Sequence, residues 1–238
     1  MQAEREVGWP VPGWKAPLPP DAPVLEGRFA RLERLDPALH ARELHAANQG
    51  DDWIWDYLGY GPFQTAADYH RWAEQMAAEQ DPWFYAIRDL ASGRVAGVAS
   101  YLRITPAQGV IEVGHICLSP ALQGTCAATE AMALMAGWVF AAGYRRYEWK
   151  CDALNRPSRR AAERLGFSYE GTFRQHMVYK GRNRDTAWFA MTDADWGKLR
   201  PCYDRWLQPE NFGPDGTQRQ SLSDLTRPHL ATRDPGPT

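Results

Sequence analysis

One turn constrains the fold of this chain more than any other part of its sequence. The apolar run at residues 109–119 is typical of a strand, and the apolar run at residues 127–142 has the length of a helix. Between them lies PALQGTC, a short segment with small residues at positions 120–126. Such a turn points several backbone N–H groups at one place, and the positive end of the helix dipole adds to them. The turn therefore predicts an anion-binding site.

The composition limits the classes of protein to which the chain can belong. A hydrophobic fraction of 44% in 238 residues is enough for a buried core. The net charge of -2 gives no general attraction for nucleic acid, so we expect no nucleic-acid partner. The four cysteines lack the spacing of a metal site, so we expect no metal. We also expect a cytoplasmic protein without a membrane role, because neither an apolar signal segment nor a run of about 18 apolar residues is found.

The two ends of the chain differ in composition from its centre. Residues 1–26 are rich in proline and contain Trp9 and Trp14, which predicts an extended N-terminal arm. Two tryptophans are costly to leave in water, so we expect the arm to dock on the body or on a partner subunit, as in a homodimer. Residues 208–238 predict a partly ordered C-terminal tail, which leaves one domain at residues 27–207.

The central domain alternates between strand and helix patterns. Strands are predicted at residues 28–35, 83–89, 94–104, 109–119, 144–152, 167–179 and 184–192. Helices are predicted at residues 37–48, 66–80, 127–142, 157–165 and 193–206. Asp36, Thr65 and Thr192 are positioned to cap three of these helices. The order of elements predicts a mixed α/β (α+β) fold without internal repeats.

Three blocks in this order resemble those of the GNAT (Gcn5-related) N-acetyltransferases. They are EVGH at residues 112–115, QGTCAATEA at residues 123–131, and NRPS at residues 155–158 followed by LGF at 165–167 and EG at 170–171. The resemblance is nearest to the branch that acetylates ribosomal-protein N-termini. It implies a mostly antiparallel twisted sheet with one splayed strand pair, flanked by helices. It also implies transfer of an acetyl group from acetyl-CoA to a primary amine of a peptide N-terminus, an amino acid or a small molecule.

The resemblance also assigns the cofactor site. In such enzymes the turn holds the pyrophosphate of acetyl-CoA, and Gln123 and Ala128 match the first and last positions of the family's loop pattern. Cys126 replaces the central glycine, so its side chain either weakens phosphate binding or points away. We expect cofactor contacts from Leu118, Gln123, Gly124, Thr125, Cys126, Ala127, Ala128, Thr129, Asn155, Ser158 and Arg160.

The transfer reaction needs a proton donor for the departing thiolate. Ser158 resembles the serine that serves the CoA sulfur in the ribosomal branch, and Asn155 resembles a pantetheine-contacting asparagine. The alternative is that either residue merely caps a helix. Many family members carry a tyrosine acid at the position of Ala162, and its absence favours Ser158 or water.

The general base is predicted on the strand that leads to the turn. By alternation, Glu112 and His115 fall on opposite faces, so that just one of them faces the cleft. We prefer Glu112, because the ribosomal branch usually has a glutamate there. The alternatives are a structural ion pair between Glu112 and an arginine of an adjacent strand, and a core position for His115.

The acceptor site is predicted from four aromatic residues and one arginine. We expect substrate contacts from Trp53, Trp55, Tyr57, Tyr101 and Arg174. The aromatic stretch that includes the first three of these residues lies between the first two helices, where it forms either core or acceptor pocket. A non-catalytic acyl-CoA-binding or regulatory module with the same fold is the alternative function.

Overall fold

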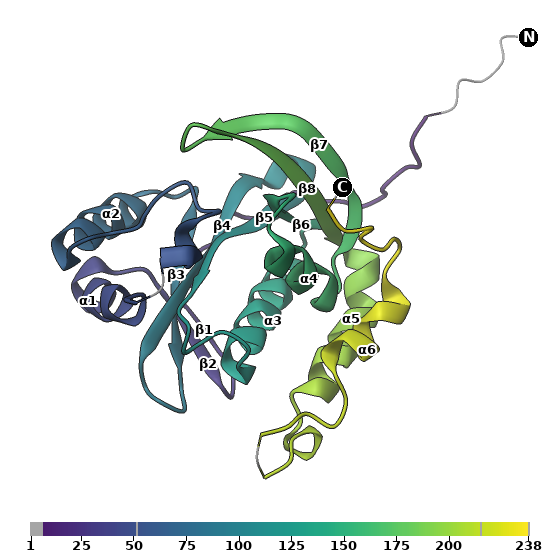
Figure 1. The fold of residues 1–238 in the computed structure, drawn as a ribbon. Coiled ribbons are helices and arrows are strands. Elements are labelled where there is room, and N and C mark those ends of the chain that lie inside the picture. Colours follow the sequence, from purple (N-terminus) through teal and green to yellow (C-terminus); the bar gives the residue numbers. More distant parts are fainter. Residues whose placement is uncertain (1–6, 51, 215, 238) are drawn as a thin grey trace, which may run out of the picture.

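The computed structural model describes residues 7–50, 52–214 and 216–237, and an eight-stranded sheet forms its centre (Figure 1). The strands are β1 (Val24–Glu26), β2 (Ala30–Arg34), β3 (Trp83–Asp89), β4 (Val95–Thr105), β5 (Val110–Leu118), β6 (Arg146–Asp152), β7 (Ser168–Tyr179) and β8 (Arg182–Thr192). Their order is β1-β2-β3-β4-β5-β6-β8-β7. In this described sheet β5 and β6 are parallel, and the other neighbours are antiparallel. The predicted mixed fold with a mostly antiparallel sheet is confirmed.

The helices begin at polar residues, as the capping signals predict. They are α1 (Pro37–Ala47), α2 (Ala66–Ala78), α3 (Cys126–Ala141), α4 (Arg156–Arg164), α5 (Asp193–Trp206) and α6 (Leu222–Thr226), with short 3-10 turns η1 (Asp52–Trp55), η2 (Pro106–Gln108), η3 (Pro209–Asn211) and η4 (Arg227–His229). Asp36, Thr65 and Thr192 each accept a backbone N–H in the first turn of α1, α2 and α5. Thr125 and Asn155 do the same for α3 and α4.

Helices cover both faces of the sheet, and each face has its own core (Figure 1). The larger cluster lies under α3 and α5 and includes Tyr101, Met135 and Tyr147. The smaller cluster lies under α1 and α2 and includes Trp72 and Phe84. A side chain of the sheet can therefore be assigned to a face by the cluster that it joins.

β5 and β6 pair over only part of their length. Their register runs from Val110 opposite Arg146 to Val113 opposite Trp149, and the described pairing ends there. β5 continues to Leu118 beside β4, and β6 continues to Asp152 beside β8. Two strand edges with free backbone groups consequently face each other, which is the splay that the family resemblance implies.

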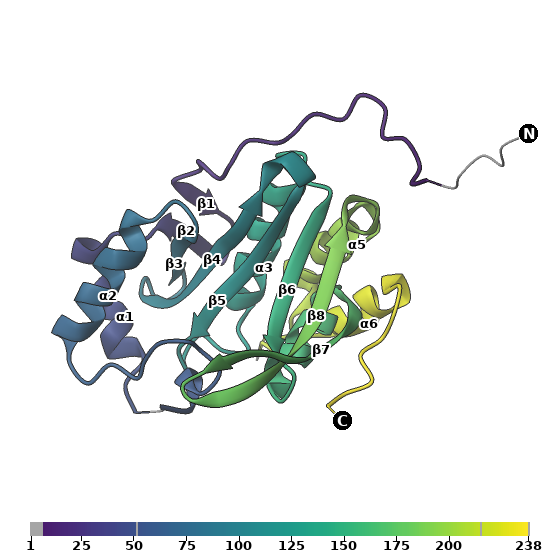
Figure 2. The same ribbon diagram turned by 90° about the horizontal axis from the view of Figure 1, so that it is seen from above.

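Both ends of the chain pack on this body. Of the predicted arm, residues 1–6 lie outside the described residues, and Val24–Glu26 forms β1. The arm crosses one end of the sheet (Figure 2), where Tyr144 Oη donates to Leu18 O and Tyr85 Oη donates to Ala22 O. It thus docks in part on its own chain, although Trp9 is 81% exposed.

The C-terminal segment is more ordered than its composition predicts. α6 packs on α5 and α4, and Thr226 Oγ1 donates to Arg164 O. Farther on, Asp234 pairs with the buried Arg159 of α4.

Across the described ranges, no helix combines the length and apolar character required to cross a membrane.

Candidate active site

Three neighbouring backbone donors lie where the turn after β5 enters α3. Leu122 and Gln123 donate to Ser119 O, and Ala128 N donates to Thr125 Oγ1. For the N–H groups of Gly124, Cys126 and Ala127, the described part of the chain supplies no acceptor. Gly124 has φ +73°, and a Cβ added there would meet nothing within 4 Å. The three amides therefore open on a space where an anion can approach closely.

Other predicted cofactor residues already have partners in the protein. Gln123 Nε2 donates to Leu118 O, which closes the turn. Thr129 N donates to Thr125 O, and Thr129 Oγ1 accepts a hydrogen bond from Arg164 Nη1. These contacts hold the turn in shape, and the amides of Gly124, Cys126 and Ala127 are not part of them.

Cys126 stands where the family pattern has its central glycine. It occupies the first position of α3, where its backbone needs no glycine-like φ. Its side chain packs against the larger core cluster, and burial raises the pKa of its thiol.

Ser158 lies at the start of α4, beside the splayed part of β6. Its N–H is capped by Asn155 Oδ1 at 3.0 Å, and its Oγ accepts a hydrogen bond from Trp149 Nε1, also at 3.0 Å. The capping role considered for Asn155 is thus present. The Trp149 contact uses the Ser158 oxygen as an acceptor, and the hydroxyl also forms a hydrogen bond with the Cys151 thiol, which opposes the rise that burial causes in the pKa of Cys151. Ala162 is fully buried.

A bulge in β5 changes which side chains share a face. Ser100 pairs with Gly114 and Val98 with Cys117, so β5 has one more residue than β4 in this interval. The extra position is His115, whose φ is +49°. Alternation reverses there, and His115 joins Glu112 on the α1–α2 face. The expectation that just one of the two faces the cleft was wrong, because regular alternation does not hold across a bulge.

Glu112 is buried between two cations. Arg103 Nη1 lies 2.7 Å from its Oε1, and Lys150 Nζ lies 2.9 Å from its Oε2. Lys150 also contacts Glu148 at 2.8 Å and lies over the Trp188 ring. Burial raises the pKa of Glu112, while Arg103 and Lys150 oppose that rise. The ion pair with an arginine of the neighbouring strand, the alternative given for Glu112, therefore exists.

His115 is held in an aromatic environment. Its ring stacks on Phe84 with centroids 5.0 Å apart, Tyr60 lies 5.9 Å away, and Nδ1 is 2.9 Å from Ser100 Oγ. Burial, assisted by the nearby Arg103, lowers the pKa of His115 to about 4. The imidazole is consequently neutral at physiological pH.

The predicted acceptor residues are dispersed. Trp53 is 46% exposed on η1, Trp55 is buried in the smaller core, and Tyr57 Oη donates to Leu154 O. Arg174 lines an open cavity of about 770 Å³ on the β7–β8 hairpin. Tyr101 is 0% exposed in the core of the opposite face, where its hydroxyl donates to Met135 O. Its burial on that face excludes it as a contact for an acceptor beside Glu112.

The β7–β8 hairpin reaches across to the segment between α1 and α2 (Figure 2). Lys180 Nζ at its tip donates to Trp55 O at 2.8 Å and to Tyr60 O at 3.3 Å. Tyr179 Oη donates to Asp152 Oδ2 on β6. The hairpin therefore bridges the splayed strand to the aromatic segment.

Sequence reasoning allowed for an arginine partner of Glu112 but named neither Arg103 nor Lys150. Lys150 lies in a strand that the sequence predicts, but its contact with Glu112 depends on the parallel register of β5 and β6. Arg103 has φ +46° beside an irregularity in β4, which no local pattern indicates. Arg160 is exposed on α4, as a phosphate contact requires, whereas Arg159 is committed to Asp234. No group of three or more possible metal-ligating side chains occurs among the residues with described positions.

Comparisons with known proteins identify the family to which this fold belongs. The family model described as "Acetyltransferase (GNAT) domain" matches residues 30–168. A GCN5-related N-acetyltransferase from Brucella melitensis has a similar crystal structure, with 45% identity over 91% of this chain and 100% of that chain, and a TM-score of 0.89. A search of curated proteins gave no match.

Two more distant structures share the fold. The microcin C7 self-immunity acetyltransferase MccE, in complex with acetyl-CoA and AMP, is 21% identical over 70% of this chain and 93% of its own, with a TM-score of 0.62. The Salmonella typhimurium acetyltransferase that modifies the N-terminal serine of ribosomal protein L7/L12 is 20% identical over 71% and 98%, with a TM-score of 0.61. By the family match and the first of these structures, the chain belongs to the GNAT family of N-acetyltransferases.

Proposed function

We propose that this acetyltransferase uses acetyl-CoA and transfers the acetyl group by direct attack of a primary amine, on a peptide N-terminus, an amino acid or a small molecule. The observation that supports it most is the conjunction of two features. Three free amides lie at the start of α3, and the unpaired edges of β5 and β6 lie next to them. A diphosphate and an amide-bearing arm need these two kinds of partner.

The residues present fit this cofactor. The N–H groups of Gly124, Cys126 and Ala127 would hold the diphosphate, with Arg160 available to a further phosphate. The free strand edges would pair with the amides of the pantetheine arm. Bound acetyl-CoA supplies an activated thioester, and the protein supplies orientation and proton transfer.

Glu112 and Ser158 divide the proton transfers. Glu112 accepts a proton from the acceptor ammonium through water, and its raised pKa suits that role. Arg103 and Lys150 keep the carboxylate in place beside the splay. Ser158 Oγ, oriented by Trp149, would donate its hydroxyl proton to the departing sulfur and take a proton back from water. His115 stays neutral, and its ring forms part of the wall of the site.

The test measures binding and turnover separately. In a thermal-shift titration, acetyl-CoA and CoA should raise the melting temperature of the protein, and GTP at the same concentration should not. A panel of peptides, amino acids and small amines is then assayed for release of free CoA thiol. We expect turnover with at least one class of primary amine.

A substitution at Ser158 separates catalysis from binding. Ser158→Ala should lower kcat about tenfold to a hundredfold and leave the affinity for acetyl-CoA nearly unchanged. Stabilisation by CoA without thiol release from any acceptor would identify a non-catalytic acyl-CoA-binding module instead. Failure of both CoA species to stabilise the protein would contradict the cofactor assignment.

A further inference from the structure

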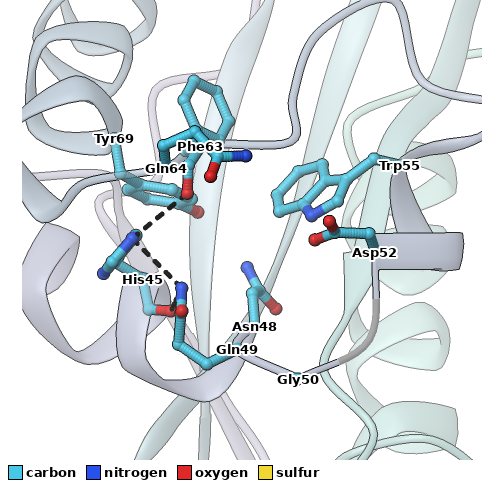
Figure 3. Close-up of a pocket in the computed structure, with 9 residues that line it drawn as sticks. All are labelled: His45, Asn48, Gln49, Gly50, Asp52, Trp55, Phe63, Gln64 and Tyr69. Carbon is cyan, nitrogen blue, oxygen red and sulfur yellow. Dashed lines mark hydrogen bonds between the residues drawn. The ribbon is translucent and has the colours of Figure 1, made fainter.

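A second cavity, of about 370 Å³, lies between the end of α1, the start of α2 and η1 (Figure 3). It is lined by His45, Asn48, Gln49, Gly50, Asp52, Trp55, Phe63, Gln64 and Tyr69. None of the residues assigned to acetyl-CoA or to proton transfer borders it. Its size is in the range of sites for small ligands.

Two buried polar atoms in this cavity lack a partner. Asn48 is 4% exposed and Tyr69 is 1% exposed, yet Asn48 Oδ1 and Tyr69 Oη make no hydrogen bond within the described structure. Figure 3 shows both side chains turned toward the cavity. Burial of polar atoms without partners is unfavourable, so the pair indicates a polar guest in the bound state.

The other lining groups define the chemistry of that guest. Asp52 contributes a carboxylate, and no lysine or arginine is among the described lining residues. Aromatic rings form one wall, with Phe63 centred 5.0 Å from Tyr69 and 5.4 Å from Trp55. His45 is engaged already, with Nε2 lying 3.3 Å from Phe63 O and 3.1 Å from Gln49 Nε2. Oxygen acceptors, one negative charge and aromatic faces together recognise an organic cation with N–H donors.

We propose that this cavity binds a small primary ammonium ion at a place separate from the acetyl-transfer site. The ammonium group donates to Asn48 Oδ1 and Tyr69 Oη, and Asp52 balances its charge. The cavity also adjoins the β7–β8 hairpin. Trp55 lines the cavity, and its main-chain carbonyl accepts a hydrogen bond from Lys180 of that hairpin.

The experiment is calorimetric titration of the full chain with putrescine in the absence of acetyl-CoA, so that no acetylation can occur. 1,4-Butanediol, which has the same chain length without charge, is the matched ligand control. Asp52→Asn should weaken putrescine binding about tenfold, and Tyr69→Phe about fivefold. Tyr69→Phe removes an oxygen without a partner, so the variant should melt no lower than the wild type.

Two further variants locate the ligand. Asp56→Asn removes an exposed carboxylate that does not line the cavity, and Glu112→Gln removes the carboxylate of the transfer site. Both should bind putrescine as the wild type does. The proposal is overturned if millimolar putrescine gives no binding, if butanediol binds equally well, or if Glu112→Gln weakens binding and Asp52→Asn does not. A Tyr69→Phe variant that melts lower, in a protein that binds no putrescine, would mean that water already satisfies the hydroxyl, and it would also overturn the proposal.

Discussion

Glu112 combines features that favour opposite protonation states. Burial favours the neutral acid, whereas Arg103 and Lys150 favour the carboxylate, and burial prevails in raising the pKa. A base is effective when its pKa lies near the working pH, so this balance suits proton transfer better than an ordinary surface glutamate would. The ion pairs also explain how a carboxylate is held in a fixed position beside the splayed strands.

Replacing Glu112 by Gln should lower kcat/KM about a hundredfold. A base acts when deprotonated, so the rate of the wild type should rise with pH through a pKa above the ordinary 4.5, and the variant should lose this rise. The measurement is the pH profile of kcat/KM for both proteins. Glu170→Gln is the control, because Glu170 is an exposed carboxylate paired with Arg146. If the pH profile of the Glu112 variant equals that of the wild type, Glu112 has only a structural role.

His115 makes the stability of the fold dependent on pH. The pKa of His115 is about 4 in the folded protein, whereas an unperturbed histidine has a pKa of 6.5. As the pH falls, the unfolded chain therefore binds a proton at this histidine before the folded protein does. The free energy of unfolding is highest above pH 6.5 and decreases by about 3 kcal/mol as the pH falls toward 4. His115→Asn tolerates the positive φ and does not titrate. Urea unfolding at neutral and acidic pH should show a weaker pH dependence in the variant, and equal dependence would contradict the assignment.

The junction of β5 and α3 carries its chemistry in the backbone, so it can be tested by removing one N–H. Cys126 is the first residue of α3, where proline is well tolerated. Thr125 before it has φ -86° and ψ 162°, which suits a residue that precedes proline. Cys126→Pro should therefore fold normally, yet bind acetyl-CoA about tenfold more weakly.

Cys126→Ala is the matched control, because it removes the same thiol and keeps the N–H. Its affinity for acetyl-CoA, measured by calorimetry, should equal that of the wild type. Equal affinities in the alanine and proline variants would show that this amide does not contact the cofactor.

Regular elements were predictable from the sequence, and irregular ones were not. Asp36, Thr65 and Thr192 cap helices where local sequence places them, because capping depends on neighbours within three residues. The bulge at His115 depends on how β5 pairs with β4, which no alternation pattern contains. The residues of the turn predicted the anion site, and the family resemblance supplied Ser158. Lys150 and Arg103 were identified as partners of Glu112 only in the folded sheet.

The ends of the molecule illustrate the same limit at long range. Residues 208–238 are polar enough to predict a tail, yet Leu222 is 0% exposed and packs in the main core. Few apolar residues suffice when a segment lies against a surface that the rest of the fold has already formed. The cavity between α1 and α2 likewise depends on how two helices and η1 come together.

Asp234 connects the end of the chain to the candidate active site, because its partner Arg159 follows Ser158 on α4. Arg159 Nε donates to Asp234 Oδ2 at 2.8 Å, and the side chains are 3% and 8% exposed. Asp234→Asn leaves a buried guanidinium without a charged partner, so it should cost about 3 kcal/mol and lower the melting temperature by roughly 6–12 °C. Asp204→Asn, at an exposed pair with Arg200, should change it little. The melting temperatures of both variants are measured by calorimetry. Equal melting temperatures would show that the C-terminal segment does not stabilise α4 through this pair.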